Sequence, residues 1–365
     1  MPTRVSSLTT PLRRSRVYIR PILTVTSRPN RTQPRVLGVV PARYSSRRFA
    51  GKPLALLRGK PLVMHVYHNA CKAKCLDACV VATDDERIAK AVRDHGGEVI
   101  MTDAACETSL ERCLEVVNRL RRRANKWNAK KKRGDSSSAE NKTTKASGDF
   151  DVVVCIDADE PFVQPHHIET AADLVINSDA VVGTLVRPGA NEEVRTNTRA
   201  VAKTKTFAKN FSPDATLFKT TQDVTSADTV KVVTDEHDYA LLFSREPVPK
   251  RCPMNSYDAT VGYKIRVGIQ ACRCDFLEKY ATLKGKSREY DKENASPPRW
   301  KNGKVIVDPD EPEQNRVVFA GHRVKVDVVE DSFVPGVKTP EDLRRLNAGL
   351  GTGLVNDLAL TFLVA

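Results

Sequence analysis

The sequence lacks two features that would place it in a membrane or a metal-binding class. It has no run of eighteen or more apolar residues in its 365 positions, so a membrane-spanning helix is not expected. It has nine cysteines but no C-x-x-C pair, so the common zinc and dithiol motifs are missing. We expect a soluble α/β protein with no transmembrane segment, whose cysteines are reduced and serve as small apolar side chains.

Acidic residues are absent from the first 36 positions, which contain eight Arg and many Ser and Thr. An Arg-rich, acid-free start is typical of a transit peptide that directs a protein to an organelle, either a mitochondrion or a plastid. The alternative is a disordered basic tail with no targeting role. We assign residues 1–35 to this leader.

The net charge of +14 invites a nucleic-acid interpretation. Residues 1–36 contribute +8 and residues 119–149 another +8, so the rest of the chain carries −2. The second tract has Trp127 as its single aromatic residue, whereas single-stranded nucleic acids are usually bound by basic and aromatic side chains together. Nucleic acid is therefore the least favoured partner, and we assign the charge to a leader and an exposed insertion.

Short apolar runs alternate with helical patterns in the first half of the chain. Strands are expected at residues 36–40, 78–83 and 99–101, and helices at 61–74 and 84–95. This alternation predicts a parallel sheet with helices on both faces. From about Val181, shorter alternating strands predict a more antiparallel second half with a smaller β-rich lobe.

One domain is expected over residues 36–350, followed by a C-terminal tail at 351–365. A helix over residues 109–123 leads into a tract rich in Lys and Ser, and we assign residues 121–149 to a basic low-complexity insertion. Two further polar stretches are expected to be surface insertions: residues 203–228 and 284–312.

A basic loop, P-A-R-Y-S-S-R-R-F-A-G-K-P-L at Pro41–Leu54, follows the first expected strand. Its cations Arg43, Arg47, Arg48 and Lys52, together with its backbone N–H groups, suit a polyanionic phosphate. It is not a Walker loop, because its glycine spacing and the proline after the lysine do not match that motif. A solvated basic loop is the alternative interpretation.

An acidic cluster, Asp157, Asp159 and Glu160, follows the apolar run at residues 151–156. Open α/β sheets bind ligands at the carboxyl ends of their strands, where this cluster is expected to lie. Crowded carboxylates raise one another's pKa unless a cation intervenes. We therefore interpret Asp159 as a metal ligand.

These segments resemble the 3-deoxy-D-manno-octulosonate (Kdo) cytidylyltransferases, or CMP-Kdo synthetases, of the nucleotide-diphospho-sugar transferase superfamily, and more distantly the sialic acid cytidylyltransferases. The resemblance covers about residues 36–346 and implies a three-layer α/β/α Rossmann-like nucleotidyltransferase fold. Its ordered blocks include the Pro41–Leu54 loop, V-V-A-T-D-D-E-R-I-A at 80–89, D-E-P at 159–161, Y-A-L-L-F-S-R at 239–245, E-Q-N-R at 313–316 and G-V-K-T-P-E-D-L at 336–343.

The resemblance implies an enzyme in which a hydroxyl of Kdo attacks the α-phosphate of CTP, releasing pyrophosphate and forming CMP-Kdo. It also implies Mg²⁺ as cofactor, held by Asp159, and a homodimer. The implied catalytic residues are Arg43, Lys52 and Asp159. The implied nucleotide-binding residues are Pro41, Ala42, Arg43, Arg48, Lys52, Thr83, Asp84 and Arg112, and the implied sugar-binding residues are Arg245, Glu313 and Gln314.

Several positions depart from the pattern of that family. Lys338 stands where the family places a second metal-binding Asp, so either its ammonium replaces part of the Mg²⁺ charge or metal binding and turnover are impaired. Ser109 replaces a glycine and Arg266 a histidine. Two alternatives therefore stay open: a CTP-dependent transferase for another sugar acid, such as a sialic acid, and a degenerate paralogue without turnover.

Overall fold

The computed structural model describes most of the expected domain. The described residues are 33–46, 48–134, 149–188, 226–248, 263–283, 300–301, 304–305, 311–329 and 336–349, with side chains described except at 127–134, 300–301, 304–305 and 349. Nearly all of the leader and the whole C-terminal tail lie outside these residues, as do most of the expected insertions at 203–228 and 284–312.

Four parallel strands form one half of a nine-stranded sheet, in the order β6-β1-β4-β5. Their residues are almost all buried and rich in Val and Ile, as expected for strands covered on both faces. The first strand continues through Pro41 to Ala42, two residues beyond the expected end. The bounds are β1 Val36–Ala42, β4 Ala78–Thr83, β5 Val99–Met101 and β6 Val152–Ile156.

The second half of the sheet is mixed, as the sequence predicts. The long strand β10 (Lys264–Arg273) runs antiparallel to β6 on one side and to β7 (Val182–Pro188) on the other. β13 (Val324–Val328) then pairs with β7 in parallel. The hairpin of β8 (Lys231–Thr234) and β9 (Ala240–Ser244) joins the start of β10 and is the described part of the β-rich lobe. Two small hairpins lie outside this sheet: β2 Leu56–Leu57 with β3 Lys60–Pro61, and β11 Trp300–Lys301 with β12 Lys304–Val305.

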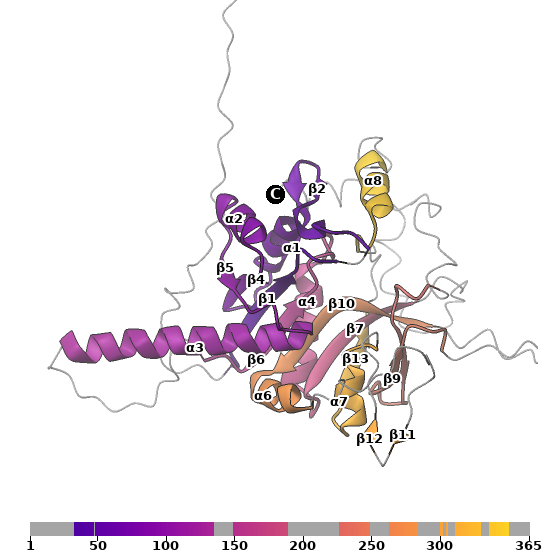
Figure 1. Ribbon diagram of the computed structural model, residues 1–365. Coiled ribbons are helices and arrows are strands. Elements are labelled where there is room, and N and C mark those ends of the chain that lie inside the picture. Colours follow the sequence, from indigo (N-terminus) through magenta and orange to yellow (C-terminus); the bar gives the residue numbers. More distant parts are fainter. Residues whose placement is uncertain are drawn as a thin grey trace, which may run out of the picture.

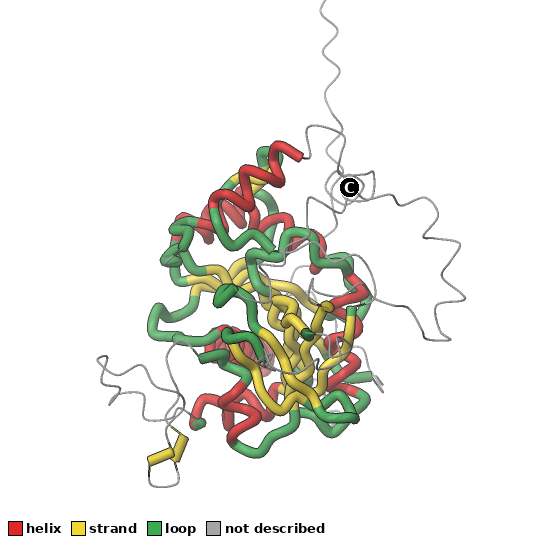
Figure 2. Tube along the Cα trace, turned by 90° about the vertical axis from the view of Figure 1, so that its right-hand side faces the viewer, coloured by secondary structure: helices red, strands yellow, loops and turns green. Residues whose placement is uncertain are grey.

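Helices cover both faces of the sheet, so the described body has three layers (Figures 1 and 2). Alternate residues of β1 serve the two faces: Val36 and Val40 pack in one core cluster, and Leu37 and Val39 in the other. One face carries α1 Leu62–Ala70, α2 Glu86–Asp94 and α4 Pro165–Ile176, and the other carries α3 Ser109–Gly134, α6 Cys274–Thr282 and α7 Asn315–Phe319. The α/β/α expectation is confirmed.

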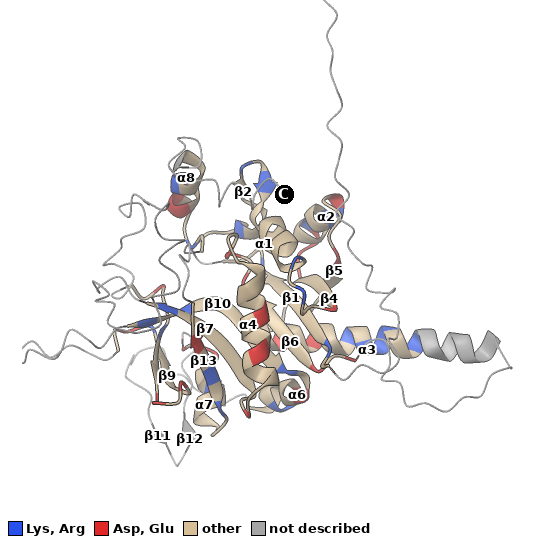
Figure 3. Ribbon diagram, turned by 180° about the vertical axis from the view of Figure 1, so that it is seen from behind, with Lys and Arg blue, Asp and Glu red and all other residues tan. Residues whose placement is uncertain are grey.

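Helix α3 is longer than the sequence pattern suggested. It was expected to end near Arg123 but continues to Gly134, because no Gly or Pro interrupts its run of good helix formers before that glycine. Its apolar side chains at the usual helical spacing, from Leu110 to Leu120, are buried. Beyond Leu120 the helix runs away from the sheet and carries Lys and Arg (Figures 1 and 3). The basic insertion therefore begins as a helical extension.

The ends of two other helices differ by a few residues from those expected from the sequence. α1 ends at Ala70, with Cys71 as its C-cap, and does not reach Lys74. α2 begins at Glu86 because the Asp85 side chain accepts a hydrogen bond from the Arg87 N–H and caps the helix. The eight described cysteines are all free, as expected. No helix in the described residues combines the length and apolarity that crossing a membrane requires.

Candidate active site

A cavity of about 210 Å³ lies at the carboxyl edge of the parallel strands. Three segments build it: the loop after β1, the first turns of α3, and the residues that follow β6. Its lining residues are Pro41, Arg43, Ser45, Ser46, Lys52, Pro53, Ser109, Arg112, Asp157, Ala158 and Asp159. All the catalytic residues expected from the sequence lie in this cavity, although the three come from two distant parts of the chain.

The loop after β1 folds back on itself and holds Lys52 toward the cavity. Gly51, at φ 70°, donates its N–H to the Tyr44 carbonyl at 2.8 Å, and a short 3₁₀ turn, η2 (Lys52–Leu54), follows. Positive φ suits glycine, and a Cβ here would also lie 3.1 Å from the Tyr44 ring. The Arg87 guanidinium lies over the Tyr44 ring, 3.4 Å from its centroid, and this contact ties the loop to α2.

Two guanidinium groups line the cavity together. Arg112 is fully buried; it donates to the Thr102 hydroxyl and, at 3.3 Å, to the Asp84 carboxylate. Arg43 donates to the Cys106 carbonyl. Burial and the nearby Arg112 charge lower the pKa of Arg43, against the opposing effect of Asp84. Such a pair of cations at a cavity wall favours an anion between them.

Asp159, which also lines the cavity, joins one carboxylate to two ammonium groups. Oδ2 of Asp159 lies 2.5 Å from Nζ of Lys52 and 3.1 Å from Nζ of Lys338, whose Nζ is also 3.4 Å from Oε1 of Glu160. The two lysines hold the pKa of Asp159 well below its usual range, against the opposing effect of burial. Burial raises the pKa of Glu160 to about 7, and the nearby carboxylates of Asp159 and Asp157 act in the same direction.

Lys338 is positioned by its own main chain. The N–H of Val337 donates to the Asp159 carbonyl at 2.8 Å. The carboxylate of Asp342 accepts the N–H groups of Lys338 and Thr339 at 2.9 and 2.7 Å, at the start of α8 (Pro340–Gly349). Gly336 is required here, because a Cβ would lie 2.6 Å from the Asp159 carbonyl oxygen.

The residues present do not fit a divalent metal held by the protein between Asp159 and position 338. Oδ1 of Asp159 and Oε2 of Glu160 are buried and lack hydrogen-bond partners in the described part of the chain. However, Oδ2 of Asp159 already contacts two ammonium groups, and Lys338 offers no oxygen to a metal. Across the described ranges, no group of three or more His, Cys, Asp or Glu side chains is arranged to hold a metal ion.

Comparison with known proteins shows to which family the chain belongs. A sequence model of the cytidylyltransferase family matches residues 37–325. The chain belongs to the cytidylyltransferase family. The 3-deoxy-manno-octulosonate cytidylyltransferase of Geotalea uraniireducens (strain Rf4) is 32% identical over 320 residues, which cover 86% of this chain and 97% of that protein.

A further sequence relative and a solved structure support the same family. The mitochondrial 3-deoxy-manno-octulosonate cytidylyltransferase of Arabidopsis thaliana is 29% identical over 315 residues, 86% of this chain and 82% of the relative. A solved structure of CMP:2-keto-3-deoxy-manno-octonic acid synthetase complexed with CTP superimposes with a TM-score of 0.59 at 26% identity, covering 87% of this chain and 98% of the other. The family expected from the sequence is confirmed.

The predicted nucleotide-binding residues fall into two groups in this cytidylyltransferase. Pro41, Arg43, Lys52 and Arg112 line the cavity. Arg48 does not, because its guanidinium pairs with Asp228 at 2.5 Å and its side chain is 40% exposed. The remaining three lie behind the lining residues. Ala42 and Thr83 are register partners on β1 and β4, and the Asp84 carboxylate accepts a hydrogen bond from the Arg112 guanidinium.

None of the predicted sugar-binding residues lines the cavity. Glu313 is fully engaged inside the protein, accepting the Ser109 N–H at 3.0 Å and the Gln270 amide at 2.5 Å, and burial raises its pKa. Gln314 is buried and donates to Gln270 at 2.7 Å. Arg245 lies outside the cavity lining and donates to the Ala227 carbonyl at 3.0 Å. Their sugar-binding roles stay predictions.

Sequence reasoning missed several residues of this region. Ser45 and Ser46 line the cavity, and a serine in a loop carries no distinctive pattern; Ser109, noted only as a departure from the family, lines it too. Gln270 links Glu313 to Gln314; a glutamine inside an apolar strand was a signal that could have found it. Arg266, noted only as a departure from the family, lies 3.5 Å from the Asp157 carboxylate.

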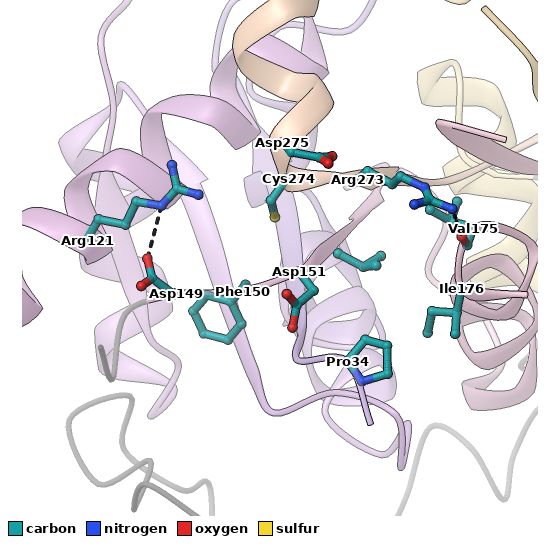
Figure 4. Close-up of a pocket in the computed structure, with 11 residues that line it drawn as sticks. Pro34, Arg121, Asp149, Phe150, Asp151, Val175, Ile176, Arg273, Cys274 and Asp275 are labelled. Atoms are coloured by element: carbon teal, nitrogen blue, oxygen red, sulfur yellow. Dashed lines mark hydrogen bonds and ion pairs between the residues drawn. The ribbon is translucent and has the colours of Figure 1, made fainter. Parts of the chain in front are cut away.

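A second cavity, of about 420 Å³, lies at the opposite end of the sheet between Pro34, the start of β6 and the start of α6 (Figure 4). Its cations are engaged within the protein. Arg121 pairs with Asp149 at 3.2 Å, and Arg273 donates to main-chain carbonyls, including that of Ser178 at 2.8 Å. In both cavities the described cations have partners within the protein, and what distinguishes the smaller one is its place at the carboxyl edge of the parallel strands, where open α/β sheets bind ligands.

Proposed function

We propose that this protein transfers CMP from CTP to 3-deoxy-D-manno-octulosonate, releasing pyrophosphate and forming CMP-Kdo. The observation that carries the proposal is the cavity itself, in which Arg43, Lys52 and Arg112 converge at the carboxyl edge of the sheet. Three cations in one cavity suit a triphosphate. The named relatives supply the base and the sugar: their names specify a cytidylyl group and 3-deoxy-manno-octulosonate.

In this proposal the chain acts by positioning and by charge. The oxygen of a sugar hydroxyl attacks the α-phosphorus of CTP and gives up its proton to solvent, the bond from that phosphorus to the bridging oxygen breaks, and pyrophosphate leaves. Negative charge grows on the phosphate oxygens, and guanidinium and ammonium groups at fixed places stabilise it. Asp159 holds the Lys52 ammonium in place at 2.5 Å, and Asp84 does the same for Arg112 at 3.3 Å.

Magnesium enters the proposal as a counter-ion carried by the triphosphate. Mg²⁺ is commonly bound through substrate phosphates with few protein ligands. It is not placed between Asp159 and Lys338, for the reasons given above. Its requirement in turnover stays a prediction.

The test is pyrophosphate release from CTP with purified protein lacking residues 1–35, with and without Kdo. We expect release only when Kdo is present, and CMP-Kdo as the product by mass spectrometry. Sialic acid as acceptor tests the related transferase: activity with sialic acid and none with Kdo would replace the proposed acceptor. Absence of turnover with every sugar acid, in a protein that still binds CTP, would favour the degenerate paralogue.

Two properties of the whole chain are also proposed. The name of the Arabidopsis relative includes a mitochondrial location, which together with the acid-free first 36 residues supports an organelle address. Fusing residues 1–36 to a fluorescent protein tests it. The homodimer implied by the family resemblance is tested by sedimentation of the purified protein.

A further inference from the structure

Lys338 brings a second ammonium group to a carboxylate that already has one. Nζ of Lys338 and Nζ of Lys52 lie 3.1 and 2.5 Å from the same oxygen, Oδ2 of Asp159. One ammonium is enough to balance one carboxylate. The second also contacts Oε1 of Glu160, at 3.4 Å. Two ammonium groups therefore converge on one carboxylate oxygen of Asp159, which lines the cavity, although Lys338 itself is not one of the lining residues.

The position of Lys338 is built into the fold. Its side chain is 29% exposed, and the described contacts use two of its three N–H donors. The preceding Val337 is fully buried in a small core cluster with Leu57 and Leu62, and the Asp342 carboxylate holds the Lys338 N–H. A surface lysine that met a carboxylate by chance would have none of this support.

The same place is where a divalent cation would be expected beside Asp159. A metal bound to Oδ2 at the usual Mg²⁺ distance of about 2.1 Å would lie next to two ammonium groups already within contact of that oxygen. Like charges at such separations repel strongly where water is scarce. A lysine and a metal therefore compete for this place, and in this chain the lysine occupies it.

We propose that Lys338 is a fixed cation of the nucleotide site, which takes with Lys52 the charge-neutralising place that a protein-held divalent metal would otherwise fill. The inference rests on the proposed function, because it concerns the phosphate tail of CTP. It goes further by assigning a role to Lys338 and by making nucleotide binding largely independent of divalent metal.

Isothermal titration of CTP tests the inference with the full chain, in EDTA and in excess Mg²⁺. We expect wild-type affinity to change by less than about tenfold between the two conditions. Lys338→Met should weaken CTP binding by about tenfold or more in EDTA, because removing a charged partner of a phosphate commonly costs that much. Lys90→Met, on the exposed surface of α2, is the matched control and should bind CTP like the wild type.

Lys338→Asp supplies a second readout that does not depend on activity. This variant places a carboxylate beside Asp159, so we expect it to bind Mn²⁺ without nucleotide, detected by electron paramagnetic resonance, and to bind CTP tightly only when metal is present. The wild type should show no such Mn²⁺ site. If Lys338→Asp fails to fold, the CTP titrations of the wild type and Lys338→Met still test whether Lys338 contributes to nucleotide binding without metal.

The outcomes separate the inference from the proposed function. A wild-type affinity for CTP that falls a hundredfold or more in EDTA, with Lys338→Met behaving like the wild type, would overturn the inference and leave CTP binding intact. A wild type that binds no CTP in either condition would overturn the proposed function, and the inference with it.

Discussion

At the scale of single residues, the cavity works through pairs in which a partly buried carboxylate fixes a cation. Asp159 holds Lys52, and Asp84 holds Arg112, whose side chain is fully buried. Each cation keeps its place without a ligand, so little reorganisation is needed when a phosphate tail enters. Removing a cation therefore affects binding directly, whereas removing a carboxylate acts through the position of its partner.

Lys52→Met tests the cation of the loop after β1. Charge-assisted hydrogen bonds contribute about 1.5–3 kcal/mol, so CTP affinity should fall roughly 10- to 150-fold, measured by titration calorimetry. The exposed Lys90→Met variant again serves as control. A Lys52→Met protein that binds CTP with unchanged affinity would show that Lys52 does not contact the nucleotide.

Glu160 makes stability depend on pH in a defined direction. Its pKa is raised from 4.5 to about 7 in the folded protein, mainly by burial. Between these values the folded state keeps a proton that the unfolded chain loses, so stability from this group is present below about pH 4.5 and is lost as pH rises through 7. Relative to Glu160→Gln, the wild type should lose up to roughly 3 kcal/mol over that window.

Urea unfolding of both proteins between pH 5 and 8 measures this difference. Glu313, whose pKa burial also raises, contributes a slope of the same sign in both proteins and cancels in the comparison. Parallel stability curves for the wild type and Glu160→Gln would contradict the raised pKa of Glu160.

At the scale of elements, the strands were easier to predict than the ends of the helices. The buried runs of β1, β4 and β6 are continuous stretches of apolar residues, which sequence patterns show directly. The end of α3 was misplaced because the periodic apolar pattern of the sequence stops at Leu120, before the helix does, and the described side chains at 121–126 are no longer buried. A helix without a core-facing stripe is visible only in three dimensions.

The extension of α3 supports a prediction about the basic insertion. Deleting residues 124–148 removes the end of α3 and leaves its buried side chains from Leu110 to Leu120, together with Ser109 and Arg112, in place. We expect unchanged CTP affinity and a melting temperature within a few degrees of the wild type. A large loss of CTP binding on deletion would assign the insertion a part in the site.

At the scale of the whole molecule, the site is assembled from segments more than a hundred residues apart. Motif order in the sequence indicated the family, and the loop cations Arg43 and Lys52 were found from it. The sequence could not show that Arg48 would pair with Asp228 or that Lys338 would share a carboxylate oxygen with Lys52, because these contacts depend on how distant loops pack. Side-chain pairing of this kind is a property of the fold.

We place the phosphate tail of CTP in the cavity that follows β1, and a crystal structure of the protein soaked with CTP would show whether it binds there. We expect the triphosphate between Arg43, Arg112 and Lys52, with Lys338 on its Asp159 side. A triphosphate bound elsewhere, with Arg43 and Lys52 turned to solvent, would contradict it.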